Sequence, residues 1–227
     1  MKISQDDVLQ FKDKYSDENR IVANIIKEQL YEQFEETIID VGAGTGDITS
    51  LALATKQVVQ LDVLDYGEKP RSKLHRRIVG DFFDYVPESS LKIGTLFFSH
   101  VFQFLDSNTV ALNHKVQVLS PAKIITVTNA NDAFMGELLA WVTENFSSAN
   151  PEIDLLDFPR AYRLTDEVRF TGQVSCEDYG SLGKQVHYLM DCEPSVSKEK
   201  ALVNFLREKL PQPMFFINQK IKVYTKA

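Results

Sequence analysis

The residues with the clearest chemical meaning are three closely spaced glycines between two aspartates. They form the stretch Asp40-Val-Gly-Ala-Gly-Thr-Gly46-Asp47, which follows an apolar run and precedes a segment of helical spacing. Glycine lets a backbone turn sharply and approach a ligand, because it has no Cβ atom. A dinucleotide loop would need its third glycine one residue later, and a P-loop would need a Lys after Gly46. The two carboxylates would also repel a pyrophosphate, so the loop favours a cationic or zwitterionic ligand.

Polar residues also stand at the ends of later apolar runs, where open α/β sheets bind their ligands. Asp62 closes one run, Asp81 follows another, and Ser99-His100 ends a third. A histidine can accept a proton near neutral pH, so His100 is the candidate general base. The alternative is a histidine that packs on a bound ligand or bonds to the backbone.

Alternating strands and helices are needed to bring these residues together. Apolar runs predict strands over 37–41, 57–63, 92–99 and 123–128, with a short third strand or its lead-in at 73–79. Helical spacing predicts helices over 18–34, 47–54, 108–119 and 134–146. This alternation predicts an α/β fold with a parallel sheet and helices on both faces. The last third predicts two strands separated by two helices, over 167–176, 178–190, 197–209 and 215–225, and we interpret the helices as part of a substrate cover.

The pattern D-x-G-x-G-x-G resembles the first motif of the class I S-adenosylmethionine-dependent methyltransferases of the small-molecule type, and later segments match that family too. The resemblance covers roughly residues 18–135. It implies a Rossmann-like fold with a mostly parallel seven-stranded sheet and a helical insertion before the last strand. It also implies a single methyltransferase domain over 1–227, with a cofactor-binding half at 1–135 and a C-terminal half at 136–227. The family's helix after the second strand is short or lost here, in DYGEKPRSK.

The resemblance implies roles for the glycine loop and for the acid that ends the second strand. The loop would pass beneath the amino-acid part of S-adenosyl-L-methionine through Gly42, Ala43, Gly44 and Gly46. Asp40 would contact the ammonium end of the cofactor, directly or through water. Asp62 would accept hydrogen bonds from both ribose hydroxyls, which suits an acceptor-only carboxylate, with Val63 beside it. Asp65 competes for this role but lies past the expected strand end.

The resemblance also implies an adenine site after the third strand. Asp81 would read the adenine amino group, and Phe82 would supply an amide donor and a hydrophobic face. The alternative is a surface turn whose phenylalanines belong to the core.

The turn after the fourth strand is where the family places contacts with cofactor and acceptor. Ser99 and His100 would contact the cofactor. Gln103 in this turn and Asn129, which follows the fifth strand at the same edge of the sheet, are the candidates for acceptor binding. Asp132 is better explained as a helix cap. The [DN]-P-P-[YFW] motif of enzymes that methylate base amines or glutamine side chains is absent from this segment of the sequence.

Composition limits the partners. The 227 residues include 25 Lys and Arg against 32 Asp and Glu, a net charge of −7, which disfavours nucleic acid because counterion release needs clustered cations. Cys176 and Cys192 are too few for a disulfide scaffold, and the histidines lack ligand spacing, so no metal site is expected. No apolar run approaches the ~18 residues that cross a bilayer, so we expect no membrane partner. The N-terminus does not resemble a signal peptide, so we expect a cytoplasmic setting.

The sequence therefore predicts transfer of a methyl group from S-adenosyl-L-methionine to an O or N atom of a small molecule, in a biosynthetic pathway. S-adenosyl-L-homocysteine would be the product, and a homodimer is one option for assembly. The alternatives are a protein or nucleic-acid methyltransferase and a non-catalytic protein that binds the cofactor. A nucleotide-binding dehydrogenase is disfavoured by Asp47, which stands where its last glycine should be.

Overall fold

The chain divides into two compact units. The structure is a computed structural model, and it describes residues 14–35, 37–65, 67, 69–102, 105, 109–130, 133–146, 158–190 and 196–227. One unit comprises Asn19–Thr128, Ile153–Arg169 and Lys220–Ala227. We call it the loop unit, because it contains the glycine loop. The other comprises Met1–Glu18, Asn129–Glu152 and Phe170–Gln219, and we call it the helix unit.

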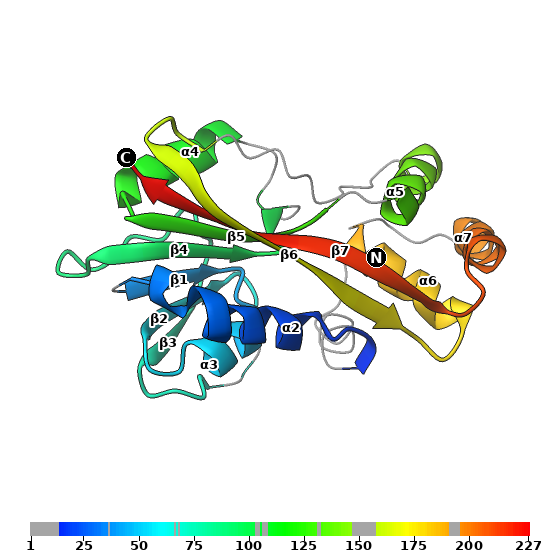
Figure 1. The fold of residues 1–227 in the computed structure, drawn as a ribbon, viewed down its shortest axis with the longest axis horizontal. Helices are drawn as coiled ribbons and strands as arrows, with labels where there is room; N and C mark the ends of the chain where they lie inside the picture. The colour runs from blue at the N-terminus through cyan, green and yellow to red at the C-terminus, as the bar shows by residue number, and fades with distance from the viewer. Residues whose placement is uncertain are drawn as a thin grey trace. The chain divides into compact units, whose positions relative to one another are not determined.

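The strands form a seven-stranded sheet in the order β3-β2-β1-β4-β5-β7-β6 (Figure 1). They are β1 (Thr37–Val41), β2 (Gln57–Asp62), β3 (His75–Val79), β4 (Ile93–Ser99), β5 (Lys123–Asn129), β6 (Tyr162–Ser175) and β7 (Met214–Lys226). The β1–β2, β1–β4, β2–β3 and β4–β5 pairs are parallel. β6 and β7 are antiparallel, because Thr165 bonds to Val223 whereas the later Thr171 bonds to the earlier Asn218. The predicted, mostly parallel seven-stranded sheet is therefore confirmed.

Most helices fall where the sequence predicts them. They are α2 (Glu18–Ile25), α3 (Asp47–Ala52), α4 (Thr109–Leu119), α5 (Ala133–Asn145), α6 (Tyr179–Leu189) and α7 (Val196–Lys209). Because α6 and α7 lie between β6 and β7 in the chain, the predicted helical insertion before the last strand is confirmed. Within the described residues, none of these helices has the length and hydropathy needed to span a bilayer.

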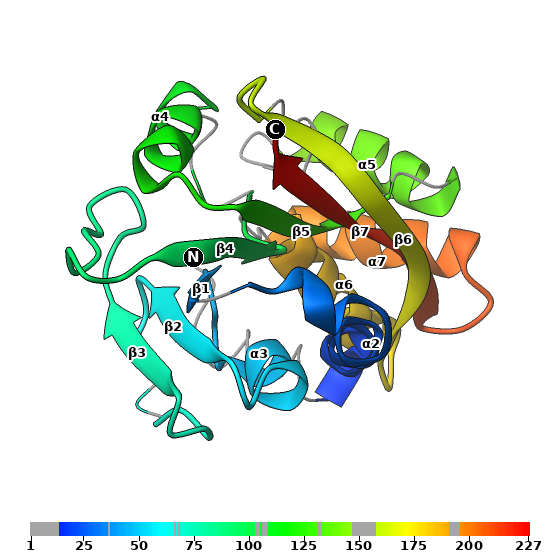
Figure 2. The ribbon, with the colours of Figure 1, turned by 60° about the vertical axis from the view of Figure 1, so that its left-hand side comes forward.

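Strand alternation gives the parallel strands two different faces. Neighbouring residues of a strand point to opposite faces, so Ile39 and Asp40 of β1 face different helices. Ile39 belongs to a buried apolar cluster that includes Leu112 and Val116 of α4, whereas the Asp40 carboxylate accepts a hydrogen bond from Thr49 of α3. α3 and α4 accordingly lie on opposite sides of the parallel strands (Figure 2), which confirms the predicted helices on both faces.

Two predicted elements differ from the structure. β6 begins at Tyr162 rather than at residue 167. Residues 163–166 are exposed and carry no apolar alternation, so there is no strand signal in the sequence there, yet Thr165 bonds to β7. The helix predicted over 18–34 is α-helical only to Ile25 and continues as a π-helix (Ile26–Leu30) and a 3-10 turn (Tyr31–Gln33). Ile26, Leu30 and Phe34 are all buried. In an α-helix, side chains four residues apart point in directions that differ by about 40° around the helix axis. The wider π turn reduces this difference, so the three side chains stay on the buried face.

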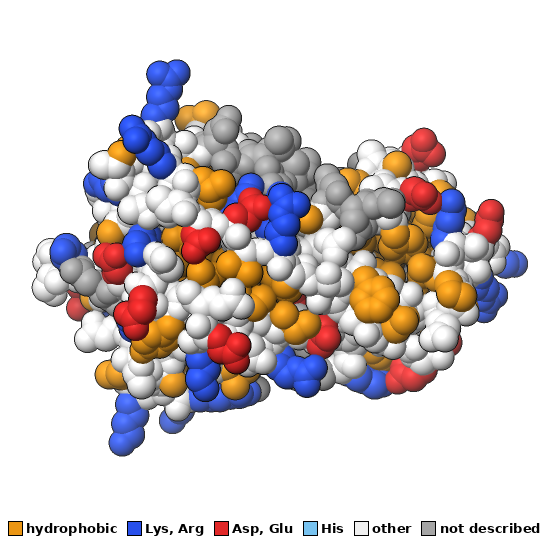
Figure 3. Space-filling model, in the orientation of Figure 1, with side chains coloured by type: hydrophobic (Ala, Val, Ile, Leu, Met, Phe, Trp, Pro, Cys, Tyr) orange, Lys and Arg blue, Asp and Glu red, His pale blue; other side chains and the backbone are white. Residues whose placement is uncertain are grey.

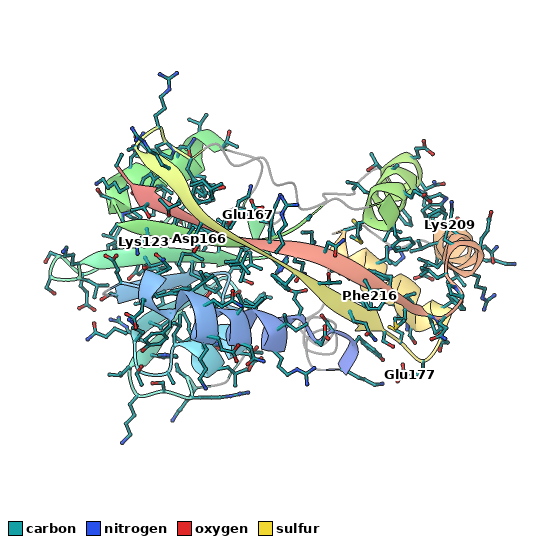
Figure 4. All side chains as sticks on the ribbon, in the orientation of Figure 1. Lys123, Asp166, Glu167, Glu177, Lys209 and Phe216 are labelled. Carbon is teal, nitrogen blue, oxygen red and sulfur yellow. The ribbon has the colours of Figure 1, made fainter. Side chains whose placement is uncertain are left out.

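The helix unit has an apolar core of its own. It includes Met135, Leu138 and Val142 of α5, Leu182 and Val186 of α6, Leu202 and Leu206 of α7, and Phe215 and Ile217 of β7. Charged side chains pair at its surface. Lys209 Nζ lies 2.8 Å from Glu137 Oε2, and Figure 4 labels Lys209 on α7 and Phe216 on β7.

Candidate functional site

The glycine loop between β1 and α3 has a backbone that only glycine adopts without strain. Gly42, Gly44 and Gly46 have φ angles of 67°, 58° and 76°, which lie in the left-handed region. A Cβ at Gly42 would lie 2.3 Å from Cγ2 of Val101, and one at Gly46 would lie 2.2 Å from Nε2 of Gln60. All three glycines are therefore required by backbone conformation, and Gly42 and Gly46 also by the side chains packed against them.

Asp62 is the last residue of β2 and its carboxylate is fixed against this loop. Its Oδ2 accepts a hydrogen bond from Gly44 N–H at 2.7 Å, and its Oδ1 accepts one from Leu64 N–H at 2.9 Å. A carboxylate oxygen can accept more than one hydrogen bond, so both oxygens can still receive a ligand hydroxyl. The competing Asp65 instead accepts from Gly67 N–H at 2.9 Å within its own turn. The carboxylate beside the glycine loop is thus that of Asp62, next to the exposed Val63.

Asp40 precedes the loop and is only 3% exposed. Its Oδ2 accepts a hydrogen bond from Thr49 Oγ1 at 2.9 Å, which ties β1 to α3 beneath the loop. Asp47, on the far side of the loop, forms an ion pair with Arg71 at 3.0 Å. The two aspartates that flank the glycines are therefore both engaged, one with a helix and one with an arginine.

Two further polar residues contact the loop, and the sequence interpretation missed both. Gln60 of β2 is fully buried, and its Nε2 donates to Gly46 O at 3.3 Å and to Thr49 Oγ1 at 3.2 Å. Arg77 of β3 donates from Nη2 to Gly44 O at 2.9 Å. The available signal was a glutamine inside the apolar run 57–63, since a buried polar side chain is the informative exception in a strand.

The turn after β4 also reaches the loop. His100 has a φ of 49°, its N–H donates to Val127 O at 3.1 Å, and the next residue, Val101, packs against Gly42. Residues other than glycine held at positive φ cluster at functional sites. Ser99 and His100 are both partly exposed at this strand end. The predicted base thus lies in the turn that packs on the glycine loop.

The segment after β3 is anchored at several points. Gly80 N–H donates to Asp62 O at 2.8 Å, and Asp81 Oδ1 accepts from Phe83 N–H at 2.8 Å. The Phe82 ring is 3% exposed, with its centroid 5.7 Å from that of Phe98. The ring therefore belongs to the core, so a contact of Phe82 with a ligand would have to come from its backbone.

Lys115 of α4 holds the same segment from the other side. Its Nζ donates to Phe83 O at 2.8 Å and to Tyr85 O at 2.5 Å. Burial lowers the pKa of Lys115, whereas the nearby acids Asp84 and Asp81 act in the opposite direction. Asp81 is thus carried by a segment that is tied to both β2 and α4.

Of the two predicted acceptor-binding residues, only Asn129 lies among those that the structure describes. Asn129 ends β5 in the helix unit, and its Oδ1 accepts a hydrogen bond from Gln219 Nε2 at 3.2 Å. Gln103 lies outside the described residues, as does Asp132. Among the residues that the structure describes, no group of three or more His, Cys, Asp or Glu side chains could hold a metal ion.

A cavity of about 280 Å³ lies elsewhere in the loop unit. It is lined at the amino ends of the strands by Thr37 of β1, Gln57 of β2 and Lys73 before β3, and by Tyr85 and Glu88 beyond them. None of the predicted site residues lines it. Since ligands of open α/β sheets bind at the carboxyl ends of the strands, we place the candidate site at the glycine loop.

Comparison with known proteins gives a match in structure only. No family model and no curated protein sequence matches the chain. The YcgJ protein from Bacillus subtilis is similar with a TM-score of 0.59 and 14% identity, over 92% of this chain and 99% of that one. The N-methyltransferase NodS from Bradyrhizobium japonicum, solved with S-adenosyl-L-homocysteine, is similar with a TM-score of 0.52 and 10% identity, over 98% and 97%. A cyclopropane-fatty-acyl-phospholipid synthase-like protein from Lactobacillus casei gives 0.53 and 11%, over 91% and 90%.

These likenesses establish the architecture. The chain has the Rossmann-like fold of the class I methyltransferases, as its sequence predicts. At such low identities the similarity extends to the fold alone.

Proposed function

We propose that this protein is an S-adenosylmethionine-dependent methyltransferase that acts on an O or N atom of a small molecule. The observation that carries the proposal is the hydrogen bond between Asp62 Oδ2 and Gly44 N–H, which joins the acid at the end of β2 to a loop of three left-handed glycines. Similar folds include an N-methyltransferase solved with S-adenosyl-L-homocysteine. In this proposal Asp62 binds the ribose, and the loop supports the amino-acid part of the cofactor.

The charges around the loop support a cationic ligand. Asp40 and Asp62 lie beside the glycines, Asp47 is paired with Arg71, and no Lys follows Gly46 to receive a phosphate. S-adenosyl-L-methionine carries a sulfonium and an ammonium, whereas a dinucleotide carries a pyrophosphate that these carboxylates would repel. The loop therefore favours the sulfonium cofactor over NAD.

When bound, the cofactor supplies an activated methyl group, and the protein supplies proximity and orientation. Gly42, Gly44 and Gly46 present the backbone to the ligand, and Asp81 with the Phe82 amide reads the adenine. His100 accepts the proton of a hydroxyl acceptor or else contacts the cofactor, and Asn129 binds the acceptor. The predicted contribution of Asp40 passes through Thr49 and the loop, because the carboxylate is buried.

The surface supports a small acceptor. On the face shown in Figure 3, the Lys and Arg side chains of the described residues are interspersed with Asp and Glu side chains. A polyanion would need clustered cations, because its binding is driven by counterion release. The biosynthetic role, the cytoplasmic setting, the single domain and the homodimer stay predictions.

Calorimetry tests the proposal directly. The protein should bind S-adenosyl-L-methionine and S-adenosyl-L-homocysteine but not NAD. Asp62→Ala should weaken binding more than about tenfold, since it removes charge-assisted hydrogen bonds. Asp65→Ala is the matched control and should bind as the wild type does. Absence of binding to both sulfur ligands would overturn the proposal.

Turnover separates an enzyme from a non-catalytic binding protein. The protein should transfer a labelled methyl group from S-adenosyl-L-methionine to a component of a metabolite extract. His100→Ala should lower that turnover and leave cofactor affinity unchanged if His100 is the base. Cofactor binding with no transfer to any candidate would instead favour the non-catalytic alternative.

A further inference from the structure

A polar pair lies beneath the glycine loop, on β2, which neighbours β1, and on β3, which neighbours β2. Gln60 of β2 and Arg77 of β3 are register partners in the parallel β2–β3 pair. Arg77 Nη2 lies 3.4 Å from Gln60 Oε1, and Gln60 Nε2 donates onward to Gly46 O and to Thr49 Oγ1. Gln60 is fully buried, and a buried polar side chain costs stability unless it is hydrogen-bonded, so its side chain has a defined orientation beside the partly buried Arg77.

The same arginine also holds the centre of the loop. Its Nη2 donates to Gly44 O at 2.9 Å, while Gly44 N–H donates to Asp62 Oδ2. Gly44 is thus bonded on both sides, to a guanidinium and to a carboxylate. Hydrogen bonds to charged groups are shorter and stronger than neutral ones. Gln60 in addition fills the space that a Cβ at Gly46 would need.

We propose that Arg77, supported by Gln60, is a positioning residue that holds the glycine loop in its left-handed conformation and thereby sets the affinity for the amino-acid part of S-adenosyl-L-methionine. The inference rests on the proposed function for its ligand. Arg77 acts through Gly44 and does not itself touch the cofactor. Without it, the carbonyl of Gly44 loses its charged donor and the loop samples other conformations.

The chain offers a matched control at the preceding residue. Arg76 lies on the same strand, but alternation directs its side chain to the opposite face, where it pairs with Glu88 at 2.5 Å. Both partners of that pair are about two-thirds exposed, at 63% and 67%. Arg76→Met therefore makes the same chemical change as Arg77→Met without touching the loop.

The test compares two ligands by calorimetry, S-adenosyl-L-homocysteine and 5′-methylthioadenosine, which lacks the amino-acid part. Arg77→Met should weaken binding of the first about tenfold, as expected for losing a charge-assisted hydrogen bond, and that of the second much less. Arg76→Met should bind both as the wild type does. Equal losses for the two ligands, or no loss for Arg77→Met, would overturn the inference.

A second measurement needs no ligand. Amide hydrogen exchange of residues 42–47 in the unliganded protein should be faster in Arg77→Met and unchanged in Arg76→Met. If Arg77→Met does not fold, Arg77→Lys replaces it, because lysine keeps the charge but lacks the planar fork. Unchanged exchange in the folded variant would overturn the inference. If exchange is faster in Arg77→Met but the wild type binds neither nucleoside, Arg77 does hold the loop, and the proposed ligand is wrong.

Discussion

The loop unit differs from the helix unit in the network of buried polar side chains that lies beneath its glycine loop, since both units also have a buried apolar cluster. Beneath the glycine loop, the buried side chains of Asp40, Thr49 and Gln60 bond to one another and to the loop. The core cluster of the helix unit is apolar, and ion pairs such as Lys209–Glu137 lie at its surface. Buried polar groups add little stability and cost much when unpaired, so we infer that those beneath the loop serve to fix the loop conformation. We therefore expect substitutions among the polar residues beneath the glycine loop to alter ligand binding, and those in the apolar core of the helix unit to alter stability alone.

The largest expected effect is in the helix unit. Leu206→Ala removes a fully buried side chain of α7 and should lower the free energy of unfolding by about 3 kcal/mol, from lost burial and a cavity. Denaturant titration measures this loss. Leu164→Ala, on a half-exposed leucine of β6, is the control and should change stability little. A weaker affinity for S-adenosyl-L-homocysteine in the folded Leu206→Ala protein would contradict the division of roles between the units.

Gly46→Ala, in the loop unit, should lower both the stability and the cofactor affinity. The left-handed φ and the overlap with Gln60 should together cost about 2 kcal/mol of stability, and the displaced loop should lose cofactor affinity. The control is Gly136→Ala in α5, where a Cβ would meet no atom within 4 Å. Because alanine favours helix, that change should stabilise by about 0.5 kcal/mol. Thermal melts measure the stability of both variants, and calorimetry measures their cofactor affinity. Equal destabilisation of Gly46→Ala and Gly136→Ala would contradict the prediction.

A smaller effect is expected at Tyr162, where β6 begins. Its hydroxyl donates to Pro121 O at 2.8 Å, so Tyr162→Phe should cost about 1 kcal/mol.

Burial also raises the pKa of Tyr162 from 10.0 to about 12. The folded protein therefore keeps a proton that the unfolded chain loses, and this contribution to stability is present below pH 10 and lost as pH rises towards 12. Unfolding titrations of wild type and Tyr162→Phe across that window test the sign. The wild type should lose stability more steeply, and parallel curves would contradict the assignment.

The smallest effect is expected for the surface charges of the helix unit. The side chains of Lys209 and Glu137 are 41% and 54% exposed, and an exposed pair of this kind contributes less than about 0.5 kcal/mol. Lys209→Ala should therefore barely shift the unfolding midpoint, and high salt should remove what shift there is. A shift as large as that of Tyr162→Phe would show that the pair is part of a stronger network.

Local patterns predicted the strands and helices that bury a continuous apolar run or stripe. β1 and β5 begin at the predicted residues, because buried strands carry their own signal in the sequence. β6 was predicted too short because an exposed edge strand needs no apolar alternation. The proximity of Asp62 to the glycine loop was also predictable, since the carboxyl ends of neighbouring parallel strands meet at one edge.

Other features of the site depend on which strands become neighbours. Arg77 reaches Gly44 only because β3 pairs with β2 in a register that sets Gln60 beside it. The Phe82 ring turns into the core because Phe98 of β4 offers an aromatic partner there. Neither contact leaves a periodic pattern in the sequence, because each joins segments far apart in the chain.

The sequence by itself determined the glycine loop, the order of its strands and helices, and the acids at the strand ends. These are local properties, since backbone freedom and hydrophobic periodicity are set by a residue and its near neighbours. Tertiary structure alone decided that Asp40 is buried against Thr49, that His100 takes a positive φ beside the loop, and that Arg77 bonds to Gly44. Each of these depends on packing between elements distant in sequence, which fixes where a side chain can find its hydrogen-bond partner.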